Sequence, residues 1–344
     1  MDIRPSSAQQ LLTATARDYL RRPHPVSGSF AELGWTGLLV PGDFGGSDGS
    51  ILDAVLLVEE LGYAGVAGPF VASAVVATTL LAAGGSEAQR KRWLPPLASG
   101  ERIATLALVE EAGTFDPAAL TLTVANGRLS GRKLFVAHAD VADDVIVALR
   151  DGAVVVSGAA PGIARVPLDT LSAAPVFEMT FDGVPVHAED RIAAPGALAA
   201  ALQAGALART AEMVGAAQRI LELTVEHART RVQGGRPIGG HQAIQHACAD
   251  MVRDVDASRE LLHLAAWKAS EGQDAAVDVA MAKAYAGDAC LAVARRAHQI
   301  FGAISYCDEH SLHVFHKRMQ AASLDFGDAA LHLETVARAI GLEA

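Results

Sequence analysis

The sequence predicts a mainly helical protein with a small β-domain in the middle of the chain. Hydrophobic residues recur at helical spacing up to about residue 103 and again from residue 194 onward. Between these regions they alternate with polar residues, and Asn126-Gly127 is typical of a hairpin turn. The chain has 344 residues, 51% of them hydrophobic, which is enough for two or three domains with their own cores. We therefore expect an N-terminal helical domain (1–103), a barrel-like middle β-domain (104–193) and a C-terminal helical bundle (194–344).

Helical spacing predicts several helices in the N-terminal domain. The expected ranges are 8–20, 51–61 and 70–83, with a short helix from Phe30 and a further helix after the capping residue Ser86. The segment 70–83 consists almost entirely of small apolar residues, so we expect it to be buried.

The middle domain is expected to contain short strands joined by turns. Alternating hydrophobic residues predict strands at 120–124, around 134–136, at 145–149, at 154–156 and at 177–181. Asp182-Gly183 then predicts a turn after the last of these strands.

The C-terminal domain is expected to be a four-helix bundle, because it contains four or five long amphipathic segments. The predicted helices span 197–229, 241–270, 275–300, 312–324 and 328–340.

Charge and composition exclude several classes of protein. The formal net charge of -11 argues against a nucleic-acid-binding surface. No apolar run is long enough to span a bilayer, and no signal peptide is visible after Met1. The three cysteines favour buried, reduced thiols, so we expect a cytoplasmic protein. His310, His313 and His316 stand three apart, a spacing that turns about 60° around a helix at each step, and we predict no metal site.

The stretch from Arg229 to His246 is the clearest candidate for a functional segment. It is a loop rich in Arg, Gln and Gly that joins two predicted long helices. Arginine offers planar donors for phosphate, and glycines permit a close approach of the backbone to a ligand. The residues alone are equally consistent with a helix hairpin whose arginines are merely solvated.

This loop resembles the start of the C-terminal domain of acyl-CoA dehydrogenases. The family pattern reads Arg-x-Gln-Phe-Gly-x-Pro-Ile, then Phe or His, Gln, and later Ala-Asp-Met. The matching residues are Arg231, Gln233, Gly235, Pro237, Ile238, His241, Gln242 and Ala249-Asp250-Met251, while Gly234 replaces the Phe. The strings 37–46 and 91–101 resemble the family's N-terminal domain, and the helical–β–helical order matches over essentially the whole chain.

The resemblance implies an FAD-dependent oxidoreductase that removes hydrogen from the α and β carbons of an acyl-CoA thioester. In the family a carboxylate takes the α-proton and the β-hydride goes to the flavin, with electron-transfer flavoprotein as the expected acceptor. FAD is expected between the middle domain and the bundle, with part of its site supplied by a neighbouring subunit. The matching cofactor-binding positions are Arg231, Gln233, Gln242, Gln299 and Gly302.

Other family positions are altered in this sequence. Ala303 and Ser305 replace two glycines near the adenosine end of FAD, where their Cβ atoms are expected to hinder backbone approach. The string that packs on the flavin ring is 135–137, and its last residue, Ala137, has no hydroxyl. The family's Thr-Glu-Pro string is likewise altered within 108–116.

The catalytic base is missing from both positions where the family places it. One lineage has its Glu where this chain has Phe326, and the other has it where this chain has Gly205. Asp325, Asp328 and Glu212 are nearby carboxylates, each of which is interpreted either as a displaced base or as a solvated or capping group.

Three hypotheses follow from these replacements. The first is the partner subunit of a heterotetrameric (α₂β₂) acyl-CoA dehydrogenase, resembling bacterial enzymes of steroid and lipid catabolism in which one subunit supplies the base. The second is a homo-oligomeric dehydrogenase with a displaced base such as Asp325 or Glu212. The third is a non-catalytic scaffold that has kept only the fold.

Overall fold

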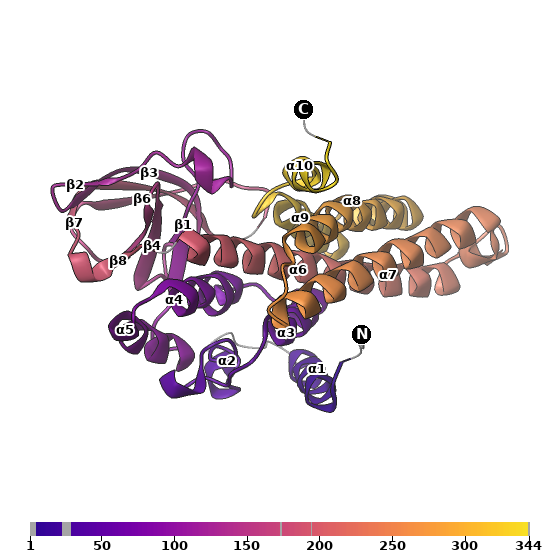
Figure 1. Cartoon of the computed structure of the whole chain (residues 1–344). Helices are drawn as coiled ribbons and strands as arrows, with labels where there is room; N and C mark the ends of the chain where they lie inside the picture. The colour runs from indigo at the N-terminus through magenta and orange to yellow at the C-terminus, as the bar shows by residue number, and fades with distance from the viewer. Residues whose placement is uncertain (1–4, 23–28, 173, 194, 343–344) are drawn as a thin grey trace. The chain divides into compact units, whose positions relative to one another are not determined.

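The computed structural model describes residues 5–22, 29–172, 174–193 and 195–342. It is mainly helical with a small sheet region in the middle of the chain, which confirms the predicted fold class (Figure 1). The chain divides into two compact units. The helical unit contains Met1–Pro23, Val55–Val66 and Ala206–Ala344, and the sheet unit contains His24–Ala54 and Ala67–Gly205. The three-domain division with boundaries at 103 and 193 stays a prediction.

The helical unit is built mainly from long helices of the C-terminal half. Its helices are α1 (Ser7–Leu20), most of α3 (Ile51–Ala64), most of α6 (Pro195–Thr230), α7 (Gln242–Ser270), α8 (Ala276–Phe301), α9 (Leu312–Leu324) and α10 (Ala329–Ala339). The 3₁₀ turns η5 (Ile238–Gly240) and η6 (Gly302–Tyr306) follow α6 and α8. α8 packs against α7, α9 and α10. The five helices predicted for this region are confirmed, with ends within two residues of those expected.

Two glycines let α3 and α6 cross with their backbones in contact. A Cβ atom at Gly215 would lie 1.9 Å from the carbonyl oxygen of Glu59, and one at Gly62 would lie 2.3 Å from that of Glu212. Real Cβ atoms do not approach backbone oxygens so closely, so only glycine permits this crossing. The close approach fixes where the carboxylates of Glu59 and Glu212 enter the unit.

The sheet unit combines short helices with eight strands among its described residues. Its helical segments are α2 (Ser29–Glu32), η1 (Gly42–Phe44), η2 (Val71–Ala77), α4 (Thr78–Gly84), α5 (Glu87–Ala98), η3 (Pro117–Ala119) and η4 (Ala188–Asp190). The strands are β1 (Ala104–Ala107), β2 (Val124–Ala125), β3 (Arg128–Ala137), β4 (Asp144–Leu149), β5 (Gly152–Ser157), β6 (Ile163–Pro167), β7 (Val176–Pro185) and β8 (Arg191–Ile192).

The strands form two four-stranded sheets that share one core. The orders are β1-β4-β5-β8, in which β1 is parallel to β4, and β2-β3-β7-β6, which is antiparallel. Leu129 and Phe181 from one sheet and Val147 and Val154 from the other belong to the same hydrophobic cluster. The alternating residues predicted in β7 belong to this core: Met179 and Phe181 are part of the cluster, and Phe177 packs against it.

Two local predictions in the sheets were wrong. Asp182-Gly183 is not a turn but lies within β7, where the pairing with β3 shifts register. Gly183 has φ 64° and its N–H donates to Ser130 Oγ at 3.0 Å, so the glycine serves a bulge instead. The strand expected at 120–124 is reduced to β2, because the N–H groups of Thr121 and Leu122 donate to the carboxylate of Glu110.

The predicted helix at 70–83 is also irregular. Its first seven helical residues, Val71–Ala77, form a π-helix before α4 continues as an α-helix. Thr78 Oγ1 donates to Ser73 O at 3.1 Å, five residues back, and Ser73 Oγ accepts the N–H of Ala104 at 3.1 Å. These side-chain bonds accompany the wider turn, which apolar periodicity alone does not distinguish from an α-helix.

The cysteine prediction was correct for Cys290 only. Burial raises the pKa of the Cys290 thiol to about 12, whereas Cys248 is partly exposed and Cys307 is exposed. All three are free thiols. No helix within the described residues is long and apolar enough to cross a membrane.

A buried charge pair holds the edge of the sheet unit. Lys133 is fully buried, and its Nζ donates to Leu108 O at 3.0 Å and to Glu110 Oε1 at 2.8 Å. Burial by itself would raise the pKa of Glu110. Hydrogen bonds from Lys133, Thr121 and Leu122 outweigh it and lower that pKa from 4.5 to about 2.

This pair predicts a loss of stability in acid. Because the pKa of Glu110 is lower in the folded than in the unfolded state, its contribution is complete above pH 4.5 and is lost as the pH falls towards 2. At pH 7 the thermal unfolding midpoint of Glu110→Gln should be lower than that of the wild type. Between pH 5 and 3 the midpoint of the variant should fall less steeply than that of the wild type. Equal slopes for the two proteins would contradict the assignment.

Candidate functional site

The loop singled out in the sequence is the free end of a helix hairpin. Figure 1 shows α6 and α7 side by side with this loop joining them. β9 (Val232–Gln233) and β10 (Arg236–Pro237) pair antiparallel across Gly234 and Gly235, whose φ angles are 61° and 79°. Two successive positive φ angles define a tight turn that glycine adopts without strain. The Ile238 N–H donates to Arg231 O at 2.9 Å, which closes the loop onto the end of α6.

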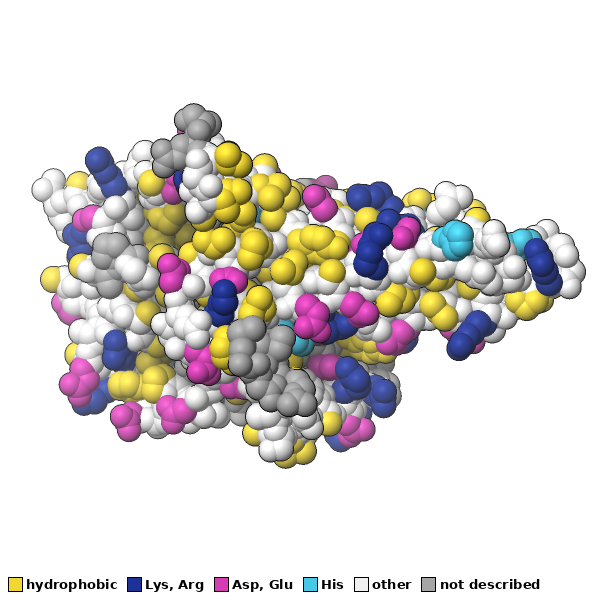
Figure 2. All heavy atoms as spheres, turned by 45° about the vertical axis from the view of Figure 1, so that its right-hand side comes forward, with side chains coloured by type: hydrophobic (Ala, Val, Ile, Leu, Met, Phe, Trp, Pro, Cys, Tyr) yellow, Lys and Arg dark blue, Asp and Glu magenta, His cyan; other side chains and the backbone are white. Residues whose placement is uncertain are grey.

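The hairpin end is positively charged and open to solvent. Residues 227–249 contain three Arg and three His but no Asp or Glu, in a chain with a net charge of -11. Figure 2 shows the corresponding dark blue and cyan side chains at the free end of the hairpin. Such a segment attracts anions, phosphates above all.

Three of the five predicted cofactor-binding residues lie together at this end. Arg231, Gln233 and Gln242 are exposed, and none of these side chains makes a hydrogen bond or ion pair within the part of the chain that is described. An added Cβ at Gly234 or Gly235 would meet no atom within 4 Å. Donors and open backbone are therefore available together for a ligand from outside the chain.

The other two predicted residues lie at the end of α8. Gln299 is exposed, and Gly302 has φ 70° where α8 gives way to η6. The ring of Phe301 stacks on His227, at the last turn of α6, with 4.3 Å between centroids. This contact places the α8 end beside the base of the hairpin that carries Arg231.

The structure revises the expected effect of the two replaced glycines. Ser305 is fully buried, and its hydroxyl contacts His298 Nδ1 at 2.8 Å and donates to Gly302 O at 2.7 Å. Its Cβ therefore points inward and does not obstruct the surface. Ala303 is exposed, so only this replacement adds a side chain on the outside.

The string that resembles the flavin-ring contact lies at the end of β3. Phe135 has φ 55° and is 56% exposed, whereas Val136 is fully buried. Ala137 offers no hydroxyl, and its carbonyl accepts Thr105 Oγ1 at 2.6 Å. Val109, in the altered Thr-Glu-Pro string, is buried and bridges to Leu134. The segment thus presents an exposed aromatic ring but no hydroxyl donor at positions 109 and 137.

Neither family position for the base carries a proton acceptor. Gly205 is a buried residue of α6. Phe326 is half-buried with φ 57°, a left-handed conformation that is uncommon for a bulky residue, and its carbonyl contacts His332 Nε2 at 3.0 Å.

The carboxylates near these positions are already engaged. Glu212 is paired with Arg209 at 2.7 Å and Arg318 at 2.8 Å. Burial opposes ionisation of Glu212, but the two guanidinium groups outweigh it and lower its pKa. Asp325 accepts Arg209 Nε at 2.8 Å, and Asp328 caps α10.

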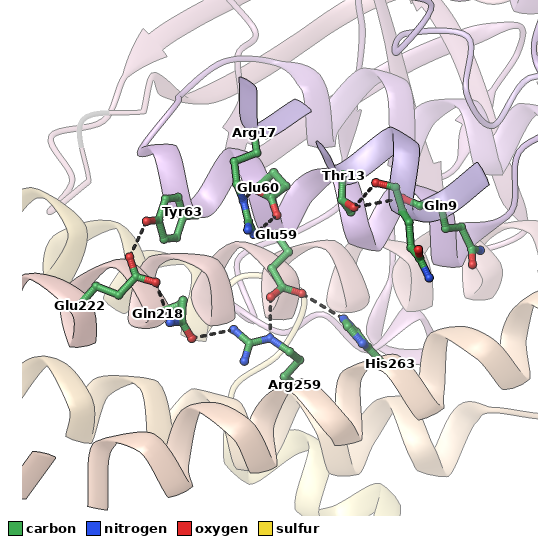
Figure 3. Close-up of polar contacts among 11 residues, drawn as sticks. Gln9, Thr13, Arg17, Glu59, Glu60, Tyr63, Gln218, Glu222, Arg259 and His263 are labelled. Atoms are coloured by element: carbon green, nitrogen blue, oxygen red, sulfur yellow. Dashed lines mark hydrogen bonds and ion pairs between the residues drawn. The ribbon is translucent and has the colours of Figure 1, made fainter. Parts of the chain in front are cut away.

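A second polar site was not predicted from the sequence. A pocket of about 260 Å³ lies between α1, α3 and α7. Figure 3 shows polar contacts among residues that line it and their neighbours. Its lining residues are Thr13, Ala14, Arg17, Leu56, Glu59, Glu60 and His263. Glu60 forms a two-pronged pair with Arg17 at 2.6 and 2.9 Å. Glu59 accepts Arg259 Nε at 2.7 Å and contacts His263 Nε2 at 3.0 Å.

This second site is best explained as a structural ion-pair network. Both carboxylates have their oxygen atoms occupied by partners of the same chain, and Gln218 links Arg259 onward to Glu222. Burial would raise the pKa of Glu59, but His263 and Arg259 lower it. Adjacent charged residues within a mainly apolar helix, Glu59 and Glu60, were the available signal that partners must exist.

Comparison with known proteins places this fold in one class, the FAD-dependent dehydrogenases. Residues 7–101 match the model of the acyl-CoA dehydrogenase N-terminal domain, and residues 196–341 match that of its C-terminal domain. The acyl-CoA dehydrogenase FadE27 of Mycobacterium tuberculosis is 31% identical over 87% of this chain and 83% of its own. The chain therefore belongs to the acyl-CoA dehydrogenase family.

Solved structures agree with this assignment. A chain of the ChsE4-ChsE5 complex from Mycobacterium tuberculosis is 27% identical, with a TM-score of 0.89 and complete coverage of both chains. The FAD complex of PigA is 26% identical, with a TM-score of 0.91 and complete coverage of both chains. Members of the family are FAD-dependent oxidoreductases that act on CH–CH groups.

The residues of this chain fit one part of FAD better than another. The cationic hairpin end, with its open glycine backbone, suits an anionic diphosphate. The β3 end has no hydroxyl at Ala137 or Val109 to donate to a flavin ring. When bound, FAD supplies the hydride acceptor; this chain's own matching residues would hold its nucleotide end.

Proposed function

We propose that this chain is the partner subunit of a heterotetrameric acyl-CoA dehydrogenase and completes an FAD site shared with a second subunit. The observation that carries the proposal is the hairpin end. Arg231, Gln233 and Gln242 face solvent without partners in the described chain, in a segment free of acidic residues. Donors that face outward suit a cofactor held mainly by another subunit. We call these three residues, together with Gln299 and Gly302, the cofactor edge.

The missing base supports the same division of labour. A general base must reach the α-proton and have a pKa suited to accepting it. Phe326 and Gly205 offer no such group. The ion pairs of Glu212 with Arg209 and Arg318, and of Asp325 with Arg209, disfavour the displaced-base hypothesis, because protonating either carboxylate would break a pair. The base is therefore assigned to the partner subunit.

Similarity to a chain of a heteromeric complex is consistent with this proposal. The substrate class is an acyl-CoA thioester, in bacterial lipid or steroid catabolism, with electron-transfer flavoprotein as acceptor and the cytoplasm as the place of action. The non-catalytic scaffold is the second candidate, favoured by the absence of a hydroxyl at Ala137.

The first experiment compares the chain alone with the chain co-expressed with a dehydrogenase subunit that carries the base. We expect a colourless chain alone, and flavin absorbance with the native mass of a tetramer after co-expression. One flavin per chain in a homo-oligomer would refute the partner-subunit proposal. A stable heteromer without flavin would favour the scaffold.

Replacing Arg231 tests the cofactor edge itself. Arg231→Ala should weaken the assembly's affinity for flavin at least about tenfold, because a charge-assisted hydrogen bond contributes about 1.5–3 kcal/mol. Arg229→Ala, at an exposed position in the last turn of α6, is the matched control and should retain flavin. The measurement is flavin absorbance per assembly after gel filtration. Full retention by Arg231→Ala would remove this residue from the site.

A further inference from the structure

Four histidines gather around η6, next to the proposed cofactor edge. They are His298 on α8, His310 before α9, and His313 and His316 on α9. The ring of His298 stacks on Tyr306 at 4.5 Å between centroids and lies 5.0 Å from the ring of His316. The described residues contain no group of three His, Cys, Asp or Glu placed to hold a metal ion. We call these four residues the histidine cluster.

The hydrogen bonds determine the proton position on His298. The single hydroxyl hydrogen of Ser305 is directed to Gly302 O at 2.7 Å. His298 Nδ1, 2.8 Å from Ser305 Oγ, must therefore donate its own hydrogen. The neutral ring then carries a bare Nε2, which is buried and has no partner among the described residues. Adding a proton at Nε2 would create a buried N–H donor without an acceptor.

The electrostatic surroundings also oppose protonation of His298. Burial lowers its pKa, and the further contributions come from His316, His313 and His310. No carboxylate is among the groups that act on it. Neighbouring histidines also have lowered pKa values. Burial and Arg295 lower the pKa of His316, and burial, Arg231 and His310 lower the pKa of His227 on α6.

A second buried nitrogen repeats this arrangement on α9. His313 Nε2 is buried without a partner in the described chain. The Leu312 N–H donates to His310 Nδ1 at 3.2 Å, so this ring nitrogen acts as an acceptor. Two buried ring nitrogens of the cluster, on His298 and His313, thus lack an acceptor for an added proton within the described residues.

The consequence is a dependence of local stability on pH. A histidine whose pKa is lower in the folded than in the unfolded state stabilises the closed state at pH values above its ordinary pKa of 6.5. That contribution is lost as the pH falls below 6.5 towards the lowered pKa of the closed state, because the open segment binds the proton more readily. Opening would free Ser305 and Tyr306 together, since both contact His298.

We propose that the histidine cluster is an acid-sensitive latch that closes η6 onto α8 and α9 at neutral pH and releases it on acidification. Gly302 is the first residue of the latched segment and Gln299 precedes it by three positions. Phe301, between them, stacks on His227 at the last turn of α6. Opening would therefore disrupt the edge assigned to FAD; this last consequence rests on the proposed function, whereas the latch does not.

Hydrogen exchange of the full chain at pH 7.5 and 5.5 tests the latch. After correction for intrinsic exchange rates, amides of 302–306 should lose protection severalfold at pH 5.5, while those of β4 and β5 should not. His298→Asn keeps a donor for Ser305 but does not titrate, so its protection should be the same at both pH values. His187→Gln, an exposed histidine of the sheet unit, should behave like the wild type.

A second variant guards against misfolding of His298→Asn. His316→Gln removes one of the neighbouring imidazoles and should reduce the pH effect without abolishing it. Equal loss of protection in the wild type and in a folded His298→Asn chain, or no loss in the wild type, would overturn the latch.

Flavin release from the co-expressed assembly over the same pH range separates the two proposals. Opening of 302–306 without flavin release would preserve the latch and argue against the cofactor edge. Flavin release without opening of 302–306 would argue against the latch and would be consistent with the cofactor edge.

Discussion

Replacing Arg209 with methionine is expected to lower the free energy of unfolding of the helical unit by about 3–5 kcal/mol, the usual effect of breaking a buried ion pair by removing one partner. The Arg209 side chain is 18% exposed and binds Glu212 at 2.7 Å and Asp325 at 2.8 Å. Without it, Glu212 keeps Arg318 as a partner, but one of its oxygens loses its donor in a buried position.

Urea unfolding followed by circular dichroism measures this effect. The double variant Arg209→Met/Glu212→Gln should recover part of the loss, because the unpaired charge is then removed. Arg338→Met is the matched control, since its pair with Glu334 is 65% exposed on both sides and should contribute less than about 1 kcal/mol. A loss below that of the control would show that the buried pair is not needed for stability.

The sequence predicted the elements that depend on local periodicity. The long helices were found because apolar residues recur along α6 to α10, and β7 was found because Phe177, Met179 and Phe181 alternate with polar residues. Asp182-Gly183 was misjudged because the same dipeptide suits a turn and a bulge, and only the pairing of β7 with β3 distinguishes them.

The candidate site was visible where its residues are contiguous. Arg231, Gln233 and Gln242 fall within twelve positions of one loop, so their proximity follows from the chain itself. The ion pairs were not visible, because Glu59 meets Arg259 across 200 positions and no spacing rule connects them. The inward orientation of Ser305 likewise depends on His298 and on the path of η6, which the replacement of a glycine does not reveal.

Gly215→Val is expected to destabilise the helical unit by about 3 kcal/mol or more, at the upper end of the usual effect of overpacking. The new Cβ would lie 1.9 Å from Glu59 O and 2.7 Å from Tyr63 N, and both are backbone atoms of α3 that no side-chain rotation can move. The helices must separate, which displaces Glu59 from Arg259 and Glu212 from Arg318 at the same time.

Gly287→Ala is expected to stabilise the protein, although Gly287 is also a buried glycine within a helix. Gly287 also lies within a buried helix, α8, but its added Cβ would find only Ser323 Cβ, at 4.0 Å. Alanine should therefore stabilise the unit by up to about 1 kcal/mol through helix propensity. Both variants are compared with the wild type by urea unfolding. If Gly215→Val were as stable as Gly287→Ala, the α3–α6 crossing would not be the contact that positions the two networks, and the charges themselves would have to hold the helices at their distance.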